Sequence, residues 1–153
     1  MQPTVVDRLI EIGELFQRDM ARTFEGTALT LARTAVLWVL HGSGPVTQQT
    51  LATALEVTPR NVTGLVDALE ATGFVRRRPH PTDRRATLVE LTETGEQATT
   101  TMVREHDELT SVLTDAVAPA DRDAFARGLE AVAAKLRELV APETAADTAE
   151  DES

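Results

Sequence analysis

The sequence predicts a mainly α-helical protein with one small β-hairpin. Over most of the chain, apolar residues recur at steps of three and four, which is the spacing of amphipathic helices. Residues 74–91 instead show two short strand-like runs around a turn that contains two prolines, which is typical of a hairpin. The length of 153 residues and the hydrophobic content of 42% are those of one domain with an ordinary core.

The N-terminal part of the chain predicts two helices. The apolar stripe of the first consists of Val5, Leu9, Ile12, Phe16 and Met20. This helix ends at Gly26. The second helix is expected from about Leu31 to Leu40, with Thr30 in the N-cap position. Residues 41–45, which include two glycines and a proline, end it.

Two short helices joined by a tight turn follow, over about residues 47–55 and 59–72. Pro59 behind Thr58 is a helix-start signal, and Gly73 is a stop signal. The inward positions of both helices are apolar or small, namely Leu51, Ala52, Leu55, Val62, Leu65, Val66 and Leu69. The outward positions around the second helix are Thr58, Arg60, Asn61, Thr63 and Gly64.

This division of positions is typical of a helix-turn-helix whose second helix enters the major groove of DNA with its amino end first. Arg60 can then bind a guanine edge and Asn61 an adenine edge, and either can bind a phosphate instead. Taken alone, the pattern also fits a helical hairpin with solvated polar positions. The segment that follows favours the DNA-binding interpretation.

Residues 74–78 and 86–91 are predicted strands, and residues 79–84 form the turn between them. Five arginines lie in this hairpin, Arg76, Arg77, Arg78, Arg84 and Arg85. Directly after a recognition helix, such a hairpin forms a wing beside the minor groove, which attracts arginine, so we expect all five to bind DNA. We expect Asp83 to hold the guanidinium of Arg85 in a bidentate ion pair. The alternative is that Asp83 is a plain turn residue.

Two long helices are predicted after the hairpin. The first begins near residues 92–96, and its apolar stripe includes Met102, Leu109, Val112 and Ala116. Pro119 separates it from the second, whose stripe contains Phe125, Leu129, Val132, Leu136 and Val140. One small core does not cover three long amphipathic helices. We therefore expect the terminal helices to pack against a second copy of the chain about a two-fold axis.

The net charge of −10 is unevenly distributed along the chain. Between Thr58 and Arg85, six arginines face three acidic residues, which gives this segment +3 and the remainder −13. A basic stripe on an acidic body still binds phosphates, because salt screens charges beyond about 8–10 Å. The local charge therefore favours DNA as a partner.

Residues 47–95 resemble the signature of the MarR (multiple antibiotic resistance regulator) family. The most specific part is the wing motif Asp83-x-Arg85 with the Leu91-Thr92-x-x-Gly95 that follows it. The other matching residues are Leu51-Ala52, Val57-Thr58, Val62-Thr63-x-Leu65-Val66-Asp67, Leu69-Glu70-x-x-Gly73-Phe74-Val75, Arg77 and Pro81. Two positions depart from the family pattern: Glu56 stands where glycine is common, and Ala68 stands where arginine is common, which removes one phosphate contact.

The resemblance implies a winged helix-turn-helix within an intertwined helical homodimer. It also implies that Arg85 enters the minor groove, that Asp83 orients it, and that residues 58–64 read the major groove of a palindromic operator. The expected organisation is an N-terminal dimerisation helix (1–29), a DNA-binding region (30–95), C-terminal dimerisation helices (96–141) and a disordered acidic tail (142–153).

The resemblance further implies a small-molecule effector, because many relatives lose DNA affinity when a small, often phenolic, anion binds between the dimer and the DNA-binding parts. Trp38 and His41 lie on one face of a predicted helix and are candidates to stack on an aromatic acid and to hydrogen-bond it. The alternative is structural, with Trp38 filling the core and His41 facing the helix dipole. The chain has no cysteine, which excludes sensing through thiols.

The sequence thus predicts a DNA-binding transcriptional regulator, with repression as the expected outcome. An enzyme is not expected, because the chain shows no phosphate-binding glycine loop and no His–carboxylate cluster. No cofactor or metal is expected, since His41, His80 and His106 lack a chelating spacing. Without a signal peptide or a membrane-spanning run, we expect a cytoplasmic protein. The alternative function is a winged helix that docks an acidic protein, although such a wing favours apolar anchors over arginines.

Overall fold

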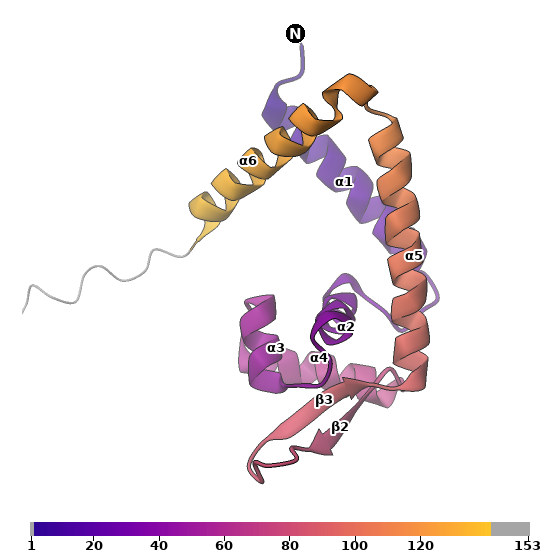
Figure 1. Ribbon diagram of the computed structural model, residues 1–153, viewed down its shortest axis with the longest axis vertical. Helices are drawn as coiled ribbons and strands as arrows, with labels where there is room; N and C mark the ends of the chain where they lie inside the picture. The colour runs from indigo at the N-terminus through magenta and orange to yellow at the C-terminus, as the bar shows by residue number, and fades with distance from the viewer. Residues whose placement is uncertain (1, 142–153) are drawn as a thin grey trace, which may run out of the picture. The chain divides into compact units, whose positions relative to one another are not determined.

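The computed structural model describes residues 2–141 (Figure 1). Its elements in this range are α1 (Val5–Phe24), α2 (Leu31–Ser43), β1 (Val46–Thr47), α3 (Gln48–Leu55), α4 (Pro59–Ala71), β2 (Val75–Pro79), β3 (Thr87–Leu91), α5 (Glu93–Asp115), the 3-10 helix η1 (Pro119–Asp121) and α6 (Arg122–Val140). The predicted fold class, mainly α with a small hairpin, is confirmed. The tail of residues 142–153 lies outside the described residues. None of the helices in the described range combines the length and the hydrophobicity needed to span a bilayer.

The chain divides after Val103 into two compact units, and the division falls within α5. The first unit holds α1–α4, the three strands and the beginning of α5. In the second unit, the rest of α5 is followed by η1 and α6, as the break at Pro119 predicts. Arg122 fixes this turn, because its guanidinium donates to the Val117 carbonyl (3.1 Å) and to the Asp115 carboxylate (3.0 Å).

The core of the first unit lies between α2, α3, α4 and the sheet. Its fully buried side chains include Val36, Leu37, Leu40, Leu51, Val62, Val66, Leu69, Val75 and Val89. The buried positions of α3 and α4 are those that the apolar spacing predicts, with Leu55 and Leu65 packed at the edge of the cluster. Each fully buried Val or Leu contributes about 1.5–3 kcal/mol. This core therefore holds α4 firmly against its neighbours.

The sheet has three antiparallel strands in the order β1-β3-β2. Arg77 of β2 and Val46 of β1 both lie opposite Val89 of β3, one on each side. The sequence predicts only the hairpin, because a two-residue strand such as β1 is too short to alternate. Thr47 of β1 is also the N-cap of α3, since its Oγ1 accepts a hydrogen bond from the Thr50 N–H (3.2 Å).

The turn between α3 and α4 contains a strained backbone position. Glu56 has φ 54° and ψ 40°, which is the left-handed conformation. Non-glycine residues adopt it at a cost of about 1–2 kcal/mol. The Glu56 N–H donates to the Thr53 carbonyl (3.3 Å), and the Val57 N–H donates to the Ala52 carbonyl (3.1 Å). These bonds close α3 although Glu56 is not the glycine that suits this position.

Gly95 lies at a close junction between α5 and the base of the hairpin. A Cβ built on Gly95 would overlap the carbonyl oxygen of Phe74. That carbonyl accepts a hydrogen bond from the Thr92 N–H (3.0 Å), and Thr92 Oγ1 donates to the Gly73 carbonyl (2.5 Å). Thr92 Oγ1 also accepts from the Gly95 N–H (3.1 Å). The Leu-Thr-x-x-Gly motif thus has a structural reason, which is to seat the first turn of α5 on the hairpin.

We expect Gly95→Ala to destabilise the protein by about 1–3 kcal/mol, because the new methyl group forces the backbone of α5 away from Phe74. The matched control is Gly64→Ala. Gly64 has no neighbouring atom within 4 Å of an added Cβ, so alanine there should stabilise α4 by about 0.5–1 kcal/mol. Urea unfolding followed by circular dichroism measures both. Equal stability of the two variants would show that the junction relaxes freely.

Candidate nucleic-acid interface

Helix α4 presents a polar face above a buried apolar base. Val62, Val66 and Leu69 are fully buried in the core. The outward residues predicted from the sequence are all exposed, namely Thr58, Arg60, Asn61, Thr63 and Gly64. Thr58 caps the helix, because its Oγ1 accepts a hydrogen bond from the Asn61 N–H (3.2 Å). The amino-terminal turn of α4 is therefore both ordered and open to solvent.

Thr63 is held by the neighbouring helix. Its hydroxyl donates to the Pro59 carbonyl (3.0 Å) and accepts from the side-chain amide of Gln48 on α3 (3.0 Å). Within residues 2–141, the side chains of Arg60 and Asn61 form no hydrogen bond or ion pair. These two side chains are the free hydrogen-bonding groups of the exposed face.

Arg77 joins the root of the wing to two helices. Its guanidinium donates to Asp67 (2.6 Å) and Glu70 (2.6 Å) of α4 and to the side-chain oxygen of Gln48 (3.0 Å) of α3. The Arg77 backbone N–H also donates to Glu70 (3.1 Å). That backbone bond, followed by the side-chain bond, lowers the pKa of Glu70. Only 24% of the Arg77 side chain is exposed, so its guanidinium is directed to protein partners.

Arg76 and Arg78 of β2 share one carboxylate. The Nε atom of each lies 2.6 Å from an oxygen of Glu90 on β3. The Glu90 side chain is 12% exposed, and the hydrogen bonds from Arg76 and then from Arg78 lower its pKa. The three side chains together therefore carry one surplus positive charge.

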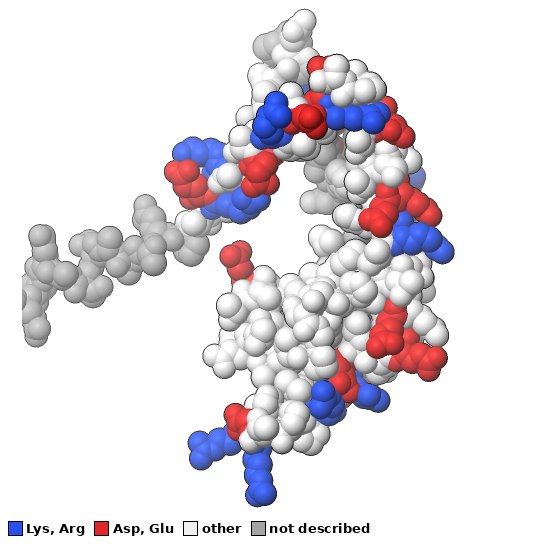
Figure 2. All heavy atoms as spheres, in the orientation of Figure 1, with Lys and Arg blue, Asp and Glu red and all other residues white. Residues whose placement is uncertain are grey.

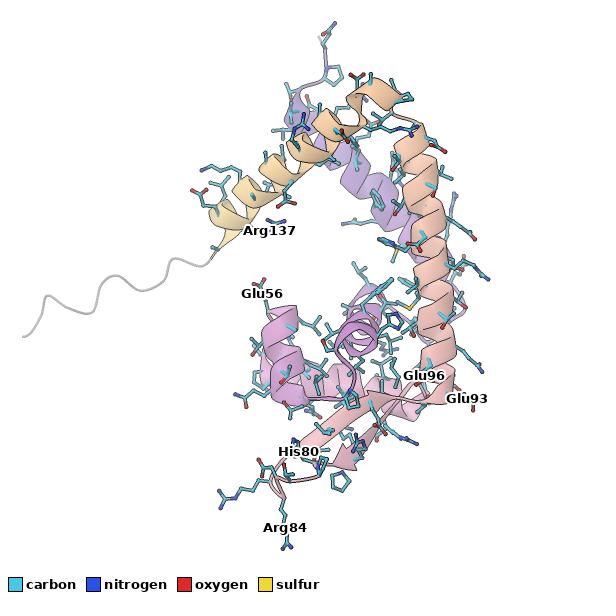
Figure 3. The ribbon with its side chains drawn as sticks, in the orientation of Figure 1. Glu56, His80, Arg84, Glu93, Glu96 and Arg137 are labelled. Carbon is cyan, nitrogen blue, oxygen red and sulfur yellow. The ribbon has the colours of Figure 1, made fainter. Side chains whose placement is uncertain are left out.

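The tip of the wing carries arginines without an acidic partner. Among the described residues, Arg84 and Arg85 form no ion pair, and both are exposed. Basic side chains protrude from the end of the hairpin in the space-filling view (Figure 2). In Figure 3, the side chain of Arg84 at this tip points away from the rest of the protein. The unpaired positive charge of the wing is thus concentrated at its tip.

The structure corrects the expectation for Asp83. Its carboxylate accepts a hydrogen bond from the backbone N–H of Arg85 (2.9 Å), and no ion pair with the Arg85 guanidinium forms among the described residues. An aspartate two residues before an N–H closes a tight turn of this kind. The alternative interpretation of Asp83, a turn residue, is therefore the one that the structure favours.

Trp38 and His41 lie together on α2, as their spacing predicts. Their rings meet edge to face with centroids 6.3 Å apart. Trp38 is 37% exposed, so it does not fill the core of its own chain. His41 lies in the last turn of α2 and lines an open cleft of about 510 Å³, together with Arg76, Glu90 and Glu96. Trp38 stands beside His41 outside the lining of this cleft.

A recognition helix packed against two further helices and a small sheet, followed by a hairpin with a basic tip, defines a winged helix-turn-helix. Residues 29–87 match the model of the MarR family. This range contains α2, β1, α3, α4, β2 and the tip of the wing, and it ends at the first residue of β3. The helix-turn-helix region of this chain is that of the MarR family of transcriptional regulators.

Several known proteins are similar to this chain in sequence or in fold. The HTH-type transcriptional repressor YetL of Bacillus subtilis is 28% identical over 79% of this chain and 74% of its own length. Seven other curated helix-turn-helix regulators match over 41–47% of their lengths. Streptococcus pneumoniae FabT, solved with DNA, has a TM-score of 0.77 at 20% identity and covers 88% of this chain and 99% of its own. Bordetella bronchiseptica BpsR has a TM-score of 0.67 at 25% identity and covers 85% and 93%.

We expect the Glu90 carboxylate to make stability depend on pH. Its pKa is lowered in the folded protein from an ordinary value of 4.5. The ionised group therefore stabilises the fold above that value, and its contribution disappears as the pH falls through the folded pKa. Glu90→Gln should lower Tm at neutral pH and flatten the fall of Tm between about pH 5 and pH 3.

Thermal unfolding at a series of pH values measures this effect. The control is Glu105→Gln, because Glu105 is exposed and its carboxylate has no hydrogen bond in the described range. If Glu90→Gln loses stability in acid as steeply as the unmodified protein, the two arginines do not stabilise the ionised form of Glu90.

Proposed function

We propose that this regulator binds a palindromic operator as a homodimer and represses transcription there. One observation carries the proposal: the open polar face of α4 is followed by a wing whose tip arginines, Arg84 and Arg85, have no acidic partner among the described residues. A helix in the major groove and a wing in the adjacent minor groove are the contacts that this combination favours.

The amino end of α4 supplies the base contacts in this proposal. The free side chains of Arg60 and Asn61 suit guanine and adenine edges. Thr58, Thr63 and Gly64 complete the face, and the absence of a side chain at Gly64 lets the DNA approach the helix backbone. Arg60 and Asn61 therefore determine which bases are preferred, whereas their three neighbours determine how closely the helix enters the groove.

The arginines of the hairpin fall into three roles. Arg85 enters the minor groove and Arg84 binds at its edge, since narrow minor grooves attract arginine. Arg76 and Arg78 keep one surplus charge with Glu90, which suits contacts to phosphates. Arg77 positions the wing instead of binding DNA, because Asp67, Glu70 and Gln48 occupy its guanidinium.

The homodimer follows from apolar surface that the single chain leaves in water. Large apolar side chains are exposed on α1, α5 and α6, including Ile10, Leu15, Phe16, Leu109, Leu113, Phe125, Leu129 and Leu136. Neither α1 nor α6 contains a buried residue. Soluble proteins rarely leave apolar patches of this extent uncovered. A second copy related by a two-fold axis covers them and requires an operator with matching symmetry.

A small aromatic acid is the effector that we propose. In Bordetella bronchiseptica BpsR, DNA binding is regulated by 6-hydroxynicotinic acid. In this chain, the open cleft beside α2 offers the His41 ring for stacking and the Arg76 guanidinium for a carboxylate. Arg76 also belongs to the wing, so a ligand that draws it away from Glu90 changes the DNA-binding surface.

We expect 6-hydroxynicotinic acid or benzoate at millimolar concentration to release the operator and to broaden NMR signals at the cleft. His41→Ala should weaken the response at least several-fold while leaving operator binding without ligand unchanged. Trp38→Ala is the comparison for His41→Ala, because Trp38 contacts His41 but does not line the cleft. Release that is unaffected by His41→Ala would place the effector elsewhere.

The DNA-binding proposal predicts that Arg85→Ala and Arg84→Ala each weaken operator binding by about 1–3 kcal/mol. Fluorescence anisotropy with duplexes from the DNA beside the gene measures this at two salt concentrations. The bound state should contain two chains for each palindromic duplex. Arg104→Ala is the matched control, because Arg104 is an exposed arginine of α5 outside the wing.

Two results would contradict the proposal in different ways. Binding with equal affinity to all duplexes would remove the base-reading role of α4. Operator binding that survives both wing substitutions would remove the wing from the interface, and the basic tip would then favour an acidic protein partner.

A further inference from the structure

The loop at the tip of the wing, residues 80–86, is built by two side-chain acceptors. The backbone closes it at its ends, where the His80 N–H donates to the Ala86 carbonyl (3.1 Å) and the Ala86 N–H donates to the Asp83 carbonyl (3.2 Å). Between these bonds the loop has no strand partner for its N–H groups. Such groups need other acceptors if the loop is to hold one conformation.

His80 supplies the first acceptor. Its Nδ1 atom accepts hydrogen bonds from the backbone N–H groups of Thr82 (3.2 Å) and Asp83 (3.1 Å). The His80 side chain is half-buried and lies at the start of the loop, on the strand side of Arg84 (Figure 3). It therefore acts as an Asp or Asn side chain does in a capped turn.

Asp83 supplies the second acceptor and continues the chain of contacts. The N–H of Asp83 donates to His80, and its carboxylate accepts from the N–H of Arg85 (2.9 Å). His80 thus fixes residue 83, and residue 83 fixes residue 85. These successive hydrogen bonds from backbone N–H groups to side chains fix the backbone that carries Arg84 and Arg85.

We propose that His80 is a positioning residue for DNA binding. Its Nδ1 atom, acting as an acceptor in the neutral Nε2–H tautomer, orders the loop that presents Arg84 and Arg85. Only an imidazole without a proton on Nδ1 accepts both N–H groups. The inference rests on the proposed DNA-binding function and adds a residue that works through Asp83 and Arg85 and not by touching DNA.

Three substitutions separate this role from direct contact. In Asn, the side-chain oxygen occupies nearly the place of Nδ1, whereas in Gln the amide lies nearer the place of Nε2. We expect His80→Asn to keep operator affinity within about twofold, and His80→Ala and His80→Gln to lose about tenfold, the scale of one or two weakened hydrogen bonds. Rescue by Gln and not by Asn would mean that Nε2 binds DNA directly and would overturn the proposal. Unchanged affinity in all three variants would overturn it as well, and so would an equal loss in all three, which would mean that the ring only packs.

A triple variant, compared with the double variant of the tip arginines, tests whether His80 acts through them. If His80 acts through the tip arginines, Arg84→Ala/Arg85→Ala combined with His80→Ala should bind no more weakly than Arg84→Ala/Arg85→Ala alone. A further loss of about tenfold in the triple variant would show that His80 contributes independently of them and would overturn the proposal.

A measurement without DNA keeps the inference separate from the proposed function. Nitrogen-15 NMR of the imidazole at pH 8.5 should show a proton on Nε2 of His80 and none on Nδ1. The amides of Thr82 and Asp83 should exchange faster with water in His80→Ala than in His80→Asn. A proton on Nδ1, or equal exchange in the two variants, would overturn the cap. A protein that shows the cap but binds no DNA would contradict only the proposed function.

Discussion

The Arg77 cluster, which consists of Arg77, Asp67, Glu70 and Gln48, holds the wing, α3 and α4 in one arrangement. The hairpin packs on the core through the buried side chains of Val75, Leu88 and Val89. Polar contacts add to this packing and join the wing to α4. One planar guanidinium meets Asp67, Glu70 and Gln48 at once, which a lysine ammonium would do less well because it lacks the rigid fork. Since Gln48 also binds Thr63, the same cluster connects the wing to the exposed face of the recognition helix.

Where the unpaired positive charge lies depends on the acidic partners of the arginines of the wing and α4 more than on the number of arginines. Asp67 and Glu70 are engaged by Arg77, and Glu90 is shared between Arg76 and Arg78. The remaining positive charge of the interface is therefore carried largely by Arg60 at the head of α4 and by the two arginines of the wing tip. Pairing at the root joins the wing to α4, and the unpaired charge at the tip is the part of the wing that we propose binds the minor groove. The strongly negative remainder of the chain opposes binding to DNA in other orientations.

Local patterns in the sequence predict most of the fold but few of the long-range partners. Apolar spacing predicts the buried face of α4, and Thr58 with Pro59 predicts where it begins, because both signals act within one or two helical turns. The pairing of Arg77 with Gln48 spans 29 residues of sequence, and no periodicity marks it. The attraction between aspartate and arginine predicts a guanidinium partner for Asp83, yet a free backbone N–H lies closer. The sequence shows only that His80 lies in a turn. Whether its ring accepts hydrogen bonds from backbone N–H groups depends on the folded loop, so the sequence does not distinguish it from any other surface histidine.

In the proposed complex, two-fold symmetry and loop order together explain how a few unpaired arginines bind an operator. In the proposed dimer each contact occurs twice, and the free energies of separated contacts add. A difference of about 0.7 kcal/mol at each wing, the scale of one hydrogen bond, then changes operator affinity about tenfold. An arginine on a mobile loop gives up about 1–2 kcal/mol for each residue that becomes ordered on binding. A tip whose backbone His80 and Asp83 already order loses less conformational freedom when it binds DNA. Most of the attraction between Arg84, Arg85 and the minor groove is then available as affinity, which makes the conformation of the loop as important as its charge.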